Sequence, residues 1–214
     1  MKLKISEIFY SIQGEGRQVG VPTTFVRLFG CNLRCTWCDS MYAVEGKDYS
    51  LLSIDTVINR IEEINCQNIC VTGGEPLLQQ RALVQLVDKL LQRNFDILLE
   101  TAGHIEPDEI FKNKKVVISM DCKCPSSKMD DKININILKK LQKKDQIKFV
   151  IKDKEDYSYA KKIVIKEQFQ AKIVFQPVYG TPISLIADLV LKDNLSVRVL
   201  PQLHKSIWGN KRGV

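Results

Sequence analysis

The sequence lacks the features that mark membrane and secreted proteins. No segment approaches the roughly 20 consecutive apolar residues that a membrane span requires. The amino terminus, Met1 to Glu7, lacks the apolar run of a signal peptide. No low-complexity or linker-like stretch divides the chain. We therefore expect a soluble, cytoplasmic protein without a membrane partner, in which residues 1–214 form a single domain.

Histidine is also scarce, since His104 and His204 are the only two in the chain. Neither lies near a plausible nucleophile, so a hydrolase built on a cysteine–histidine pair has little support. The seven cysteines are an odd number in a chain of this size and expected compartment. This argues against a disulfide framework and favours reduced thiols or metal ligands.

The net charge of +7 comes mostly from lysines in the second half of the chain. These lysines are interspersed with acidic residues, and no aromatic residues alternate with them as in sites for single-stranded nucleic acid. A solvated surface explains them better than a basic binding face. We expect no direct nucleic-acid partner.

Three cysteines stand close together as Cys31-x3-Cys35-x2-Cys38. An iron–sulfur cube normally takes four cysteine ligands, so this loop needs a distant fourth thiol or leaves one iron open to another ligand. Structural zinc, held by the three thiols and a further ligand, is the alternative.

Apolar segments of strand length alternate with amphipathic segments along the chain. After an apolar–polar segment at residues 5–10, strands are expected at residues 23–29, 68–72, 96–100, 116–120, 147–151, 172–176 and 197–200. Helices are expected at residues 54–64, 77–93, 107–111, 134–141, 155–166 and 182–191. Strands separated by helices of crossover length favour an α/β protein with a parallel sheet. A closed eightfold barrel typically needs about 250 residues, so we expect an incomplete (β/α) barrel with a mostly parallel sheet; a doubly wound sheet is the second option.

Unusual residues follow the expected strands at their carboxyl ends, where such folds place their sites. They are the cysteine loop up to Ser40, Thr72-Gly73-Gly74-Glu75-Pro76, Glu100-Thr101, Asp121-Cys122-Lys123, Lys152 and Gln176-Pro177. This recurrence predicts a single functional face.

Several of these residues have both a functional and an ordinary interpretation. Gly73-Gly74 would expose backbone groups to a ligand, and Glu75 could accept from an ammonium group or a hydroxyl, although the same residues could form a plain strand-to-helix turn. Asp39 and Ser40 offer oxygens to a cation such as Mg²⁺, although Ser40 could instead cap a turn.

Two basic residues are equally ambiguous. Arg27, in an otherwise apolar strand, could bind a substrate carboxylate or form an internal salt bridge with Glu15 or Glu100. Lys123 could hold a carboxylate or hydroxyls, or extend to solvent. The remaining cysteines could form a second cluster but are more typical of buried apolar positions; they are Cys66, Cys70, Cys122 and Cys124.

The cysteine triplet with Trp37 before its last member, together with Gly73-Gly74-Glu75-Pro76, resembles the radical S-adenosylmethionine superfamily. The resemblance implies a [4Fe-4S] cluster on Cys31, Cys35 and Cys38, whose open iron binds S-adenosylmethionine. Reductive cleavage of that cofactor gives a 5′-deoxyadenosyl radical, which abstracts hydrogen from a shielded substrate.

Further motifs resemble one family of this superfamily. They are Ser11-Ile12-Gln13-Gly14-Glu15-Gly16, Gly20-x-Pro22-Thr23-x-Phe25-Val26-Arg27, Gly30-Cys31-Asn32-Leu33, Trp37-Cys38-Asp39 and Gln202-Leu203-His204-Lys205. The resemblance implies a lyase that contracts 6-carboxy-5,6,7,8-tetrahydropterin to 7-carboxy-7-deazaguanine with loss of ammonia, a step toward queuosine or archaeosine.

The same resemblance implies the roles of individual residues. Substrate contacts fall on Ile12, Gln13, Gly14, Arg27 and Thr72. Contacts to S-adenosylmethionine fall on Trp37, Asp39, Gly74, Glu75, Asp121, Cys122, Lys123 and Gln176. Mg²⁺ falls on Ser40, where many members have threonine, and Asp121 lies in a loop that differs from the Ser-Pro-Lys version of some members. The expected partners are a flavodoxin- or ferredoxin-like reductant and a second copy in a homodimer.

Two alternatives stay open at this point. A glycyl-radical-enzyme activase shares the cysteine spacing and the Gly-Gly-Glu-Pro turn, and would act on a protein partner. The loop Gln13-Gly14-Glu15-Gly16 argues against it, because activases usually carry Asp-Gly-Pro-Gly there. A non-catalytic zinc or nucleic-acid-binding module is favoured only by the lysine excess.

Overall fold

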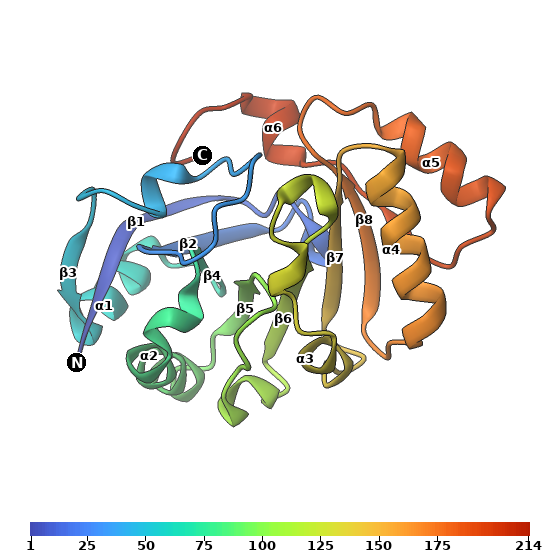
Figure 1. Ribbon diagram of the computed structural model, residues 1–214. Helices are drawn as coiled ribbons and strands as arrows, with labels where there is room; N and C mark the ends of the chain where they lie inside the picture. The colour runs from blue at the N-terminus through green and yellow to red at the C-terminus, as the bar shows by residue number, and fades with distance from the viewer.

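A nine-stranded sheet is the frame of the computed structural model, which describes residues 1–214 (Figure 1). The strands are β1 (Lys2–Ile12), β2 (Pro22–Leu28), β3 (Ser50–Ser53), β4 (Asn68–Gly73), β5 (Asp96–Thr101), β6 (Val116–Cys122), β7 (Gln146–Ile151), β8 (Lys172–Pro177) and β9 (Arg198–Val199). Their order is β3-β1-β2-β4-β5-β6-β7-β8-β9. Neighbours from β2 to β9 are parallel, whereas β1 runs antiparallel to β2 and β3.

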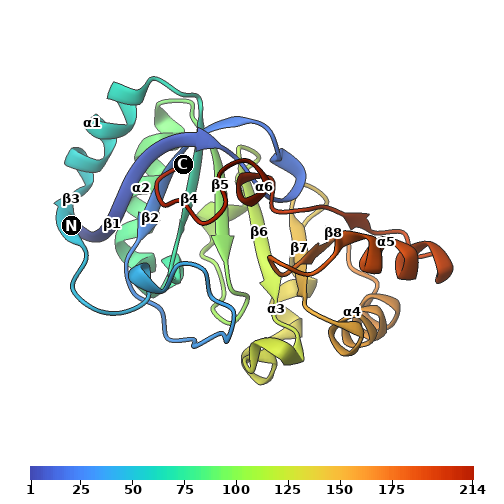
Figure 2. The ribbon, with the colours of Figure 1, turned by 90° about the horizontal axis from the view of Figure 1, so that it is seen from above.

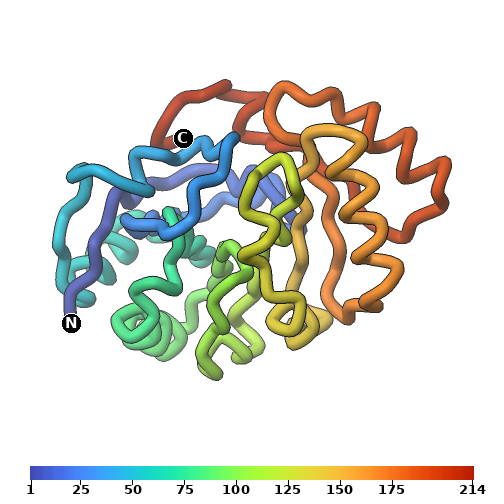
Figure 3. The backbone as a smooth tube through the Cα atoms, viewed as in Figure 1, coloured from blue at the N-terminus to red at the C-terminus, as the bar shows by residue number.

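The sheet is open, because the end strands β3 and β9 do not pair with each other. The backbone trace follows a curved arc rather than a closed ring (Figure 3). The main helices lie along the outer side of this arc (Figure 1), whereas a doubly wound sheet carries helices on both faces. The expected incomplete barrel with a mostly parallel sheet is therefore confirmed.

Six α-helices and six short 3₁₀ turns connect the strands. The helices are α1 (Ile54–Ile64), α2 (Gln80–Gln92), α3 (Ile135–Lys139), α4 (Lys154–Glu167), α5 (Ile183–Lys192) and α6 (Leu203–Trp208). The turns are η1 (Gly16–Gln18), η2 (Met41–Ala43), η3 (Pro76–Gln79), η4 (Glu109–Lys112), η5 (Pro125–Ser127) and η6 (Asp130–Lys132). None of the helices has the length and apolar character needed to span a membrane.

The helices pack on the sheet through the apolar stripes that their sequences predict. In α1 the buried side chains are Ile54, Val57, Ile58 and Ile61, a helical spacing that turns one face inward. The side chain of Ser53 caps this helix by accepting from the backbone N–H of Thr56 at 3.1 Å. The main hydrophobic core contains 36 buried residues from strands and helices.

Helix α6 was not among the expected helices, and three further local features differ from the sequence-based expectation. Strand β3 was not expected, because its four residues are too few for a pattern and Leu51 is exposed. The helix expected at residues 107–111 is the 3₁₀ turn η4, which Asp108 caps through the N–H of Ile110. The helix expected from residue 77 begins as η3 and becomes α2 only at Gln80.

Candidate functional site

The carboxyl ends of the parallel strands surround a cavity of about 440 Å³. Most residues that the sequence singles out line it: Ile12, Gln13, Gly14, Arg27, Cys31, Cys35, Trp37, Cys38, Asp39, Ser40, Thr72, Gly74, Asp121, Lys123 and Gln176. Two other residues with a role predicted from the sequence, Glu75 and Cys122, do not line the cavity. Parallel strands end at one edge of a sheet, which is why residues so distant in sequence meet here.

Cys31, Cys35 and Cys38, with Trp37 between the last two, form what we call the cysteine wall. The three thiols are free of disulfides. They do not converge on a position for one metal ion, whereas in a cluster each thiolate takes a separate iron. Burial raises the pKa of the Cys31 and Cys35 thiols. A bound cluster would offset that cost, because metals hold cysteine as the thiolate.

Gly73 and Gly74 bring β4 against the backbone of the cysteine loop. The N–H of Gly74 donates to Leu28 O at 3.1 Å, and that of Glu75 donates to Gly30 O at 2.8 Å. A Cβ atom at Gly73 would lie 2.1 Å from Leu28 O, and one at Gly74 would lie 2.4 Å from Gly30 O. Only glycine fits at either position, so this turn anchors the loop that carries the thiols.

Glu75 and Cys122 do not offer their side chains to the cavity, contrary to the sequence-based interpretation of Glu75. The carboxylate of Glu75 is fully buried and accepts hydrogen bonds from the N–H groups of Leu77 and Ala102 and from the hydroxyl of Thr101. Cys122 is fully buried in the main core, because its side chain lies on the opposite face of β6 from Asp121. Either residue could meet a cofactor only through its backbone.

Ser40 keeps its hydroxyl available. It precedes η2, yet its side chain makes no capping hydrogen bond, so the turn-capping interpretation is wrong. Its Oγ atom lies 3.8 Å from the thiol of Cys38. The neighbouring Asp39 pairs with Lys205 of α6, Nζ to Oδ2, at 3.3 Å. Two oxygen donors therefore lie directly beside the cysteine wall.

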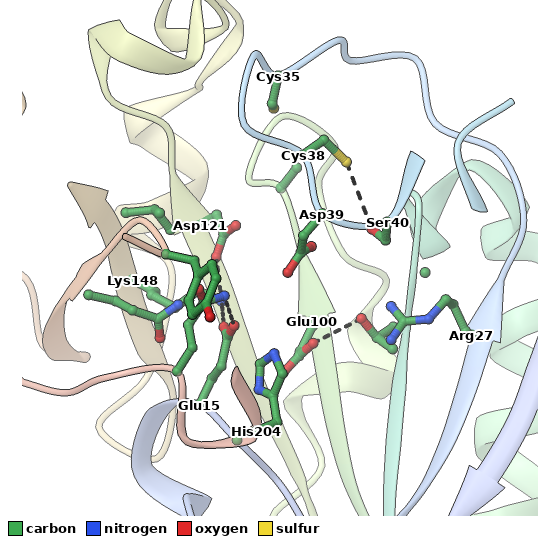
Figure 4. Close-up of a pocket in the computed structure, with 18 of the residues that line it drawn as sticks. Glu15, Arg27, Cys35, Cys38, Asp39, Ser40, Glu100, Asp121, Lys148 and His204 are labelled. Atoms are coloured by element: carbon green, nitrogen blue, oxygen red, sulfur yellow. Dashed lines mark hydrogen bonds and ion pairs between the residues drawn. The ribbon is translucent and has the colours of Figure 1, made fainter. Parts of the chain in front are cut away.

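Facing the thiols is what we call the charged wall: Glu15, Arg27, Glu100, Asp121 and Lys148 (Figure 4). The Lys148 ammonium pairs with Glu15 and lies 3.2 Å from Asp121, and its side chain is 8% exposed. Burial alone would lower the pKa of Lys148, but Asp121, Glu15 and Glu100 raise it well above its usual range. The lysine is charged at neutral pH and neutralises the carboxylates around it.

The acidic residues of this wall differ in their proton affinity. Burial would raise the pKa of Glu15, but Lys148 and His204 lower it below its ordinary value. Burial raises the pKa of Glu100, and Lys148 offsets only part of that rise. Glu100 accepts hydrogen bonds from the Thr72 hydroxyl at 2.8 Å and from the Gln13 amide at 3.2 Å. A carboxyl group with a raised pKa in a cavity is suited to exchanging a proton with a ligand.

Arg27 pairs with Glu7 rather than with Glu15 or Glu100, the partners that the sequence suggested. Its Nε atom donates to Glu7 Oε1 at 2.8 Å, because the antiparallel register of β1 and β2 sets Glu7 opposite Arg27. This bond leaves the two terminal nitrogens without a hydrogen-bond partner in the chain, at the cavity. They remain available for the bidentate grip that guanidinium offers a carboxylate.

Lys123 connects the two walls. Its Nζ atom lies 2.5 Å from Asp121 Oδ2 and 5.3 Å from the centroid of the Trp37 ring. Burial would lower the pKa of Lys123, but Asp121 and Cys35 raise it. The residue is 8% exposed, so it does not extend to solvent.

Gln176 offers the cavity a buried oxygen that suits a polar ligand. It is 1% exposed, it lines the cavity, and its Oε1 atom is buried without a hydrogen-bond partner. An unsatisfied buried carbonyl costs about 1–3 kcal/mol, which a ligand donor would recover.

The carboxyl-terminal segment borders the cavity through Gln202, His204 and Lys205, and its ribbon passes over the central strands of the sheet (Figure 2). The N–H of Leu203 donates to Gly14 O at 2.9 Å. Arg212 then pairs with Glu7 at 3.0 Å and with Asp48 at 2.6 Å. Val214, the last residue, lines the cavity.

Sequence reasoning missed several residues of the site. Lys148 lies in an otherwise apolar strand, the same pattern that drew attention to Arg27, and it could have been found in that way. Glu100 was noted only for its place at a strand end. Gln202, His204 and Lys205 were noted as a motif, but no pattern placed α6 over the cavity.

The four other cysteines do not form a second site. Cys66 donates to Pro22 O at 3.3 Å, and Cys70 accepts from the Gln13 amide at 3.6 Å. All four are buried, and they do not converge on a position for a metal ion. They occupy apolar positions, as the ordinary interpretation of buried cysteine holds.

Residues 26–152 match the model of the Radical SAM superfamily. The cavity, with three free thiols at the end of a parallel strand in an open (β/α) barrel, is that of a radical S-adenosylmethionine enzyme.

Near-full-length relatives narrow the assignment. The 7-carboxy-7-deazaguanine synthase of Thermoplasma acidophilum is 39% identical over 211 residues, which cover 98% of this chain and 99% of that protein. The synthase of Clostridium acetobutylicum is 37% identical over 227 residues, with both chains covered in full. The chain belongs to the 7-carboxy-7-deazaguanine synthase family.

A solved structure agrees on the fold. The crystal structure of QueE from Escherichia coli superposes with a TM-score of 0.80 over 95% of both chains, at 22% sequence identity. The family assignment does not favour the activase alternative, and it favours an enzyme over a zinc or nucleic-acid-binding module.

Proposed function

We propose that this protein contracts 6-carboxy-5,6,7,8-tetrahydropterin to 7-carboxy-7-deazaguanine with release of ammonia, in queuosine or archaeosine biosynthesis. The observation that carries the proposal is one cavity in which a cysteine wall faces a charged wall with free guanidinium nitrogens. Relatives that cover the whole chain carry the name of this synthase. A carboxylated, polar heterocycle is the kind of ligand that such a wall accommodates.

We propose that Cys31, Cys35 and Cys38 hold the [4Fe-4S] cluster that membership in the superfamily implies. The free thiols and the orphaned carbonyl of Gln176 suit a cluster with a polar cofactor beside it. When bound and reduced, the cluster and S-adenosylmethionine supply a 5′-deoxyadenosyl radical. The chain's own part is to place the substrate and to keep water out.

Contacts to S-adenosylmethionine are proposed for residues beside the three thiols, some of which belong to the two walls. They are Trp37, Asp39, Asp121, Lys123 and Gln176 through their side chains, and Gly74, Glu75 and Cys122 through their backbone. The support is their position: the first five and Gly74 line the cavity next to the cysteine wall. Glu75 and Cys122 are included only because the backbone beside them borders that space.

The pterin is proposed to lie against the charged wall. The terminal nitrogens of Arg27 would bind its carboxylate, while Ile12, Gln13, Gly14 and Thr72 border its ring. Gln13 and Thr72 both bind Glu100, so these side chains are held in place before the substrate arrives. Glu100, with its raised pKa, is the group best suited to give or take a proton there.

Mg²⁺ at Ser40 is part of the proposal. The Ser40 hydroxyl lines the cavity without a capping role, and oxygen is the donor that Mg²⁺ prefers. Serine lacks the methyl group that restrains threonine, so its hydroxyl is held less firmly.

The remaining proposals concern the protein as a whole. We propose a single domain over residues 1–214, supported by one main core of 36 residues. A homodimer, a flavodoxin- or ferredoxin-like reductant and a cytoplasmic location stay predictions from the sequence.

The carboxyl-terminal tail is proposed to cover the bound substrate. Its support is the pairing of Arg212 with Glu7, which also holds Arg27. Deleting Lys211 to Val214 should raise the KM for the pterin, because the cavity then opens to water. Unchanged kinetics in the truncated protein would rule out the covering role.

The direct experiment is to reconstitute the protein anaerobically with iron and sulfide, reduce it, and add S-adenosylmethionine, Mg²⁺ and the carboxypterin. We expect the deazaguanine, identified by its mass and ultraviolet spectrum. A colourless protein with stoichiometric zinc, or a protein that cleaves S-adenosylmethionine and leaves the carboxypterin unchanged, would contradict the proposal.

A further inference from the structure

Asp156 lies outside the cavity, in the first turn of α4, with its side chain fully buried. It is not needed to cap that helix. Asp153 does so by accepting from the N–H groups of Glu155 and Asp156. Asp156 Oδ2 accepts from the N–H of Lys152, a residue that precedes α4, at 2.8 Å. A buried carboxylate needs further donors, and these lie on another element.

The donors belong to Ser126 in η5. Its N–H donates to Asp156 Oδ1 at 2.9 Å, and its hydroxyl donates to Asp156 Oδ2 at 2.5 Å. A carboxylate that binds both groups of one serine fixes its side-chain rotamer and leaves the hydroxyl oxygen free to accept. That oxygen accepts from Trp37 Nε1 at 3.0 Å.

The same turn binds the residue before Trp37. The hydroxyl of Thr36 donates to Ser126 O at 2.5 Å, and the N–H of Thr36 donates to Ser127 O at 3.2 Å. Thr36 and Trp37 are the two residues between Cys35 and Cys38, so η5 holds the whole link between these thiols. Figure 1 shows the turn that follows β6 beside the start of α4.

We propose that Asp156 and Ser126 are positioning residues of the iron–sulfur site. They touch neither cofactor nor substrate. They fix Thr36 and Trp37, and through them the separation and direction of the Cys35 and Cys38 thiols. The inference rests on the proposed role of the three cysteines as cluster ligands. It adds that a carboxylate on α4 sets the geometry of a loop more than a hundred residues earlier.

The first test uses the protein without its cluster, so that it does not depend on the proposed function. In a Trp208→Phe background Trp37 is the only tryptophan, and its fluorescence reports the loop directly. Ser126→Ala and Asp156→Asn should shift the emission to longer wavelength and increase quenching by acrylamide. Ser126→Ala removes the hydroxyl that accepts from the indole N–H, and Asp156→Asn weakens the contact that holds this hydroxyl in place.

The matched control is Asp193→Asn. Asp193 is also a carboxylate bound to α4, through the Tyr157 hydroxyl at 2.7 Å and Lys161 at 2.8 Å, but it contacts no part of the cysteine loop. Its variant should keep the fluorescence of Trp37 unchanged while removing comparable contacts from the same helix.

The second test follows release of iron from the anaerobically reconstituted protein to a chelator. We expect release to be about tenfold faster in Asp156→Asn and about fivefold faster in Ser126→Ala, from the loss of charged and neutral hydrogen bonds respectively. The double variant should be no faster than Asp156→Asn, because both changes break one chain of contacts. Asp193→Asn should match the wild type.

Folded variants with wild-type fluorescence and wild-type iron release would overturn the inference. If Asp156→Asn does not fold, Ser126→Ala and Trp37→Phe decide the matter, since each removes one end of the same hydrogen bond. Iron release should be faster than in the wild type in both variants, and wild-type rates in both would again overturn the inference. If the unsubstituted protein takes up no cluster, the proposed function fails, while the fluorescence result still decides whether Asp156 and Ser126 hold the loop.

Discussion

The two walls of the cavity are built in different ways. The cysteine wall comes from one short stretch of chain, and its thiols have no partner that makes them charged. The charged wall draws on the residue before η1 and on β2, β5, β6 and β7, and its ions neutralise each other within the chain. The cysteine wall therefore needs an added group to hold its thiols as thiolates, whereas the charges of the charged wall are balanced within the chain and only the terminal nitrogens of Arg27 lack a partner.

This difference separates the expected consequences of mutation. Changes in the cysteine wall should abolish chemistry and leave the fold intact, because the loop lies outside the main core. Changes in the charged wall should affect stability and substrate affinity together, because buried ions lose their partners.

The largest effect is expected for the cysteine wall. Alanine at Cys31, Cys35 or Cys38 should abolish cleavage of S-adenosylmethionine, because a cluster that loses a ligand is not held in place. Cys66→Ala and Cys70→Ala are the matched controls and should retain cleavage. Cleavage is measured as the 5′-deoxyadenosine formed. Loss of cleavage in the folded control variants would contradict the prediction that only Cys31, Cys35 and Cys38 are needed for it.

The next effect concerns Lys148. Lys148→Met should lower the free energy of unfolding by about 3 kcal/mol, because it leaves the carboxylate of Glu15 without its counter-charge and that of Asp121 with Lys123 alone. Lys172→Met, an exposed lysine at the start of β8, should change it by less than about 0.5 kcal/mol. Chemical denaturation of both variants measures the contrast, and equal stabilities would show that the charged wall is not structural.

Arg27 should show a smaller effect, on binding. Arg27→Ala should weaken pterin binding by about 2 kcal/mol, the range for hydrogen bonds to charged groups. Arg198→Ala, an exposed arginine of β9, should leave the affinity unchanged. Calorimetric titration with the carboxypterin provides the measurement, and wild-type affinity in Arg27→Ala would remove this residue from the substrate site.

The smallest expected effect is a pH dependence of stability. The pKa of Glu15 is lower in the folded protein than its unfolded value of about 4.3, so its contribution is present above that pH and is lost as pH falls. The advantage of the wild type over Glu15→Gln should therefore narrow by about 1 kcal/mol between pH 6 and pH 3. A constant difference across this range would mean that Glu15 is not stabilised as a carboxylate.

The two walls also differ in how much the sequence reveals. The cysteine wall could be predicted almost entirely, because the spacing of its thiols is local and the glycines that anchor it follow the next strand. The charged wall could not be predicted as a unit, because it depends on strand order and on which face of β7 carries Lys148. The true partner of Arg27 was missed for the same reason: Glu7 is set opposite it only by the register of β1 and β2.

The sequence predicted most strands of the fold but not the short strand β3 or the place of the carboxyl-terminal segment. The seven later strands follow from their apolar runs, whereas the short strand β3 has too few residues for any pattern. The carboxyl-terminal segment shows the same limit, because the motif Gln202-Leu203-His204-Lys205 is visible in the sequence but its place at the cavity depends on the curvature of the whole sheet.

The central claim is that one wall generates the radical and the other holds the molecule it acts on. One anaerobic assay tests it by measuring 5′-deoxyadenosine and 7-carboxy-7-deazaguanine together in the wild type, Arg27→Ala and Cys35→Ala. We expect both products from the wild type, 5′-deoxyadenosine with little deazaguanine from Arg27→Ala, and neither product from Cys35→Ala. Equal loss of both products in Arg27→Ala, or deazaguanine formation in Cys35→Ala, would contradict the account.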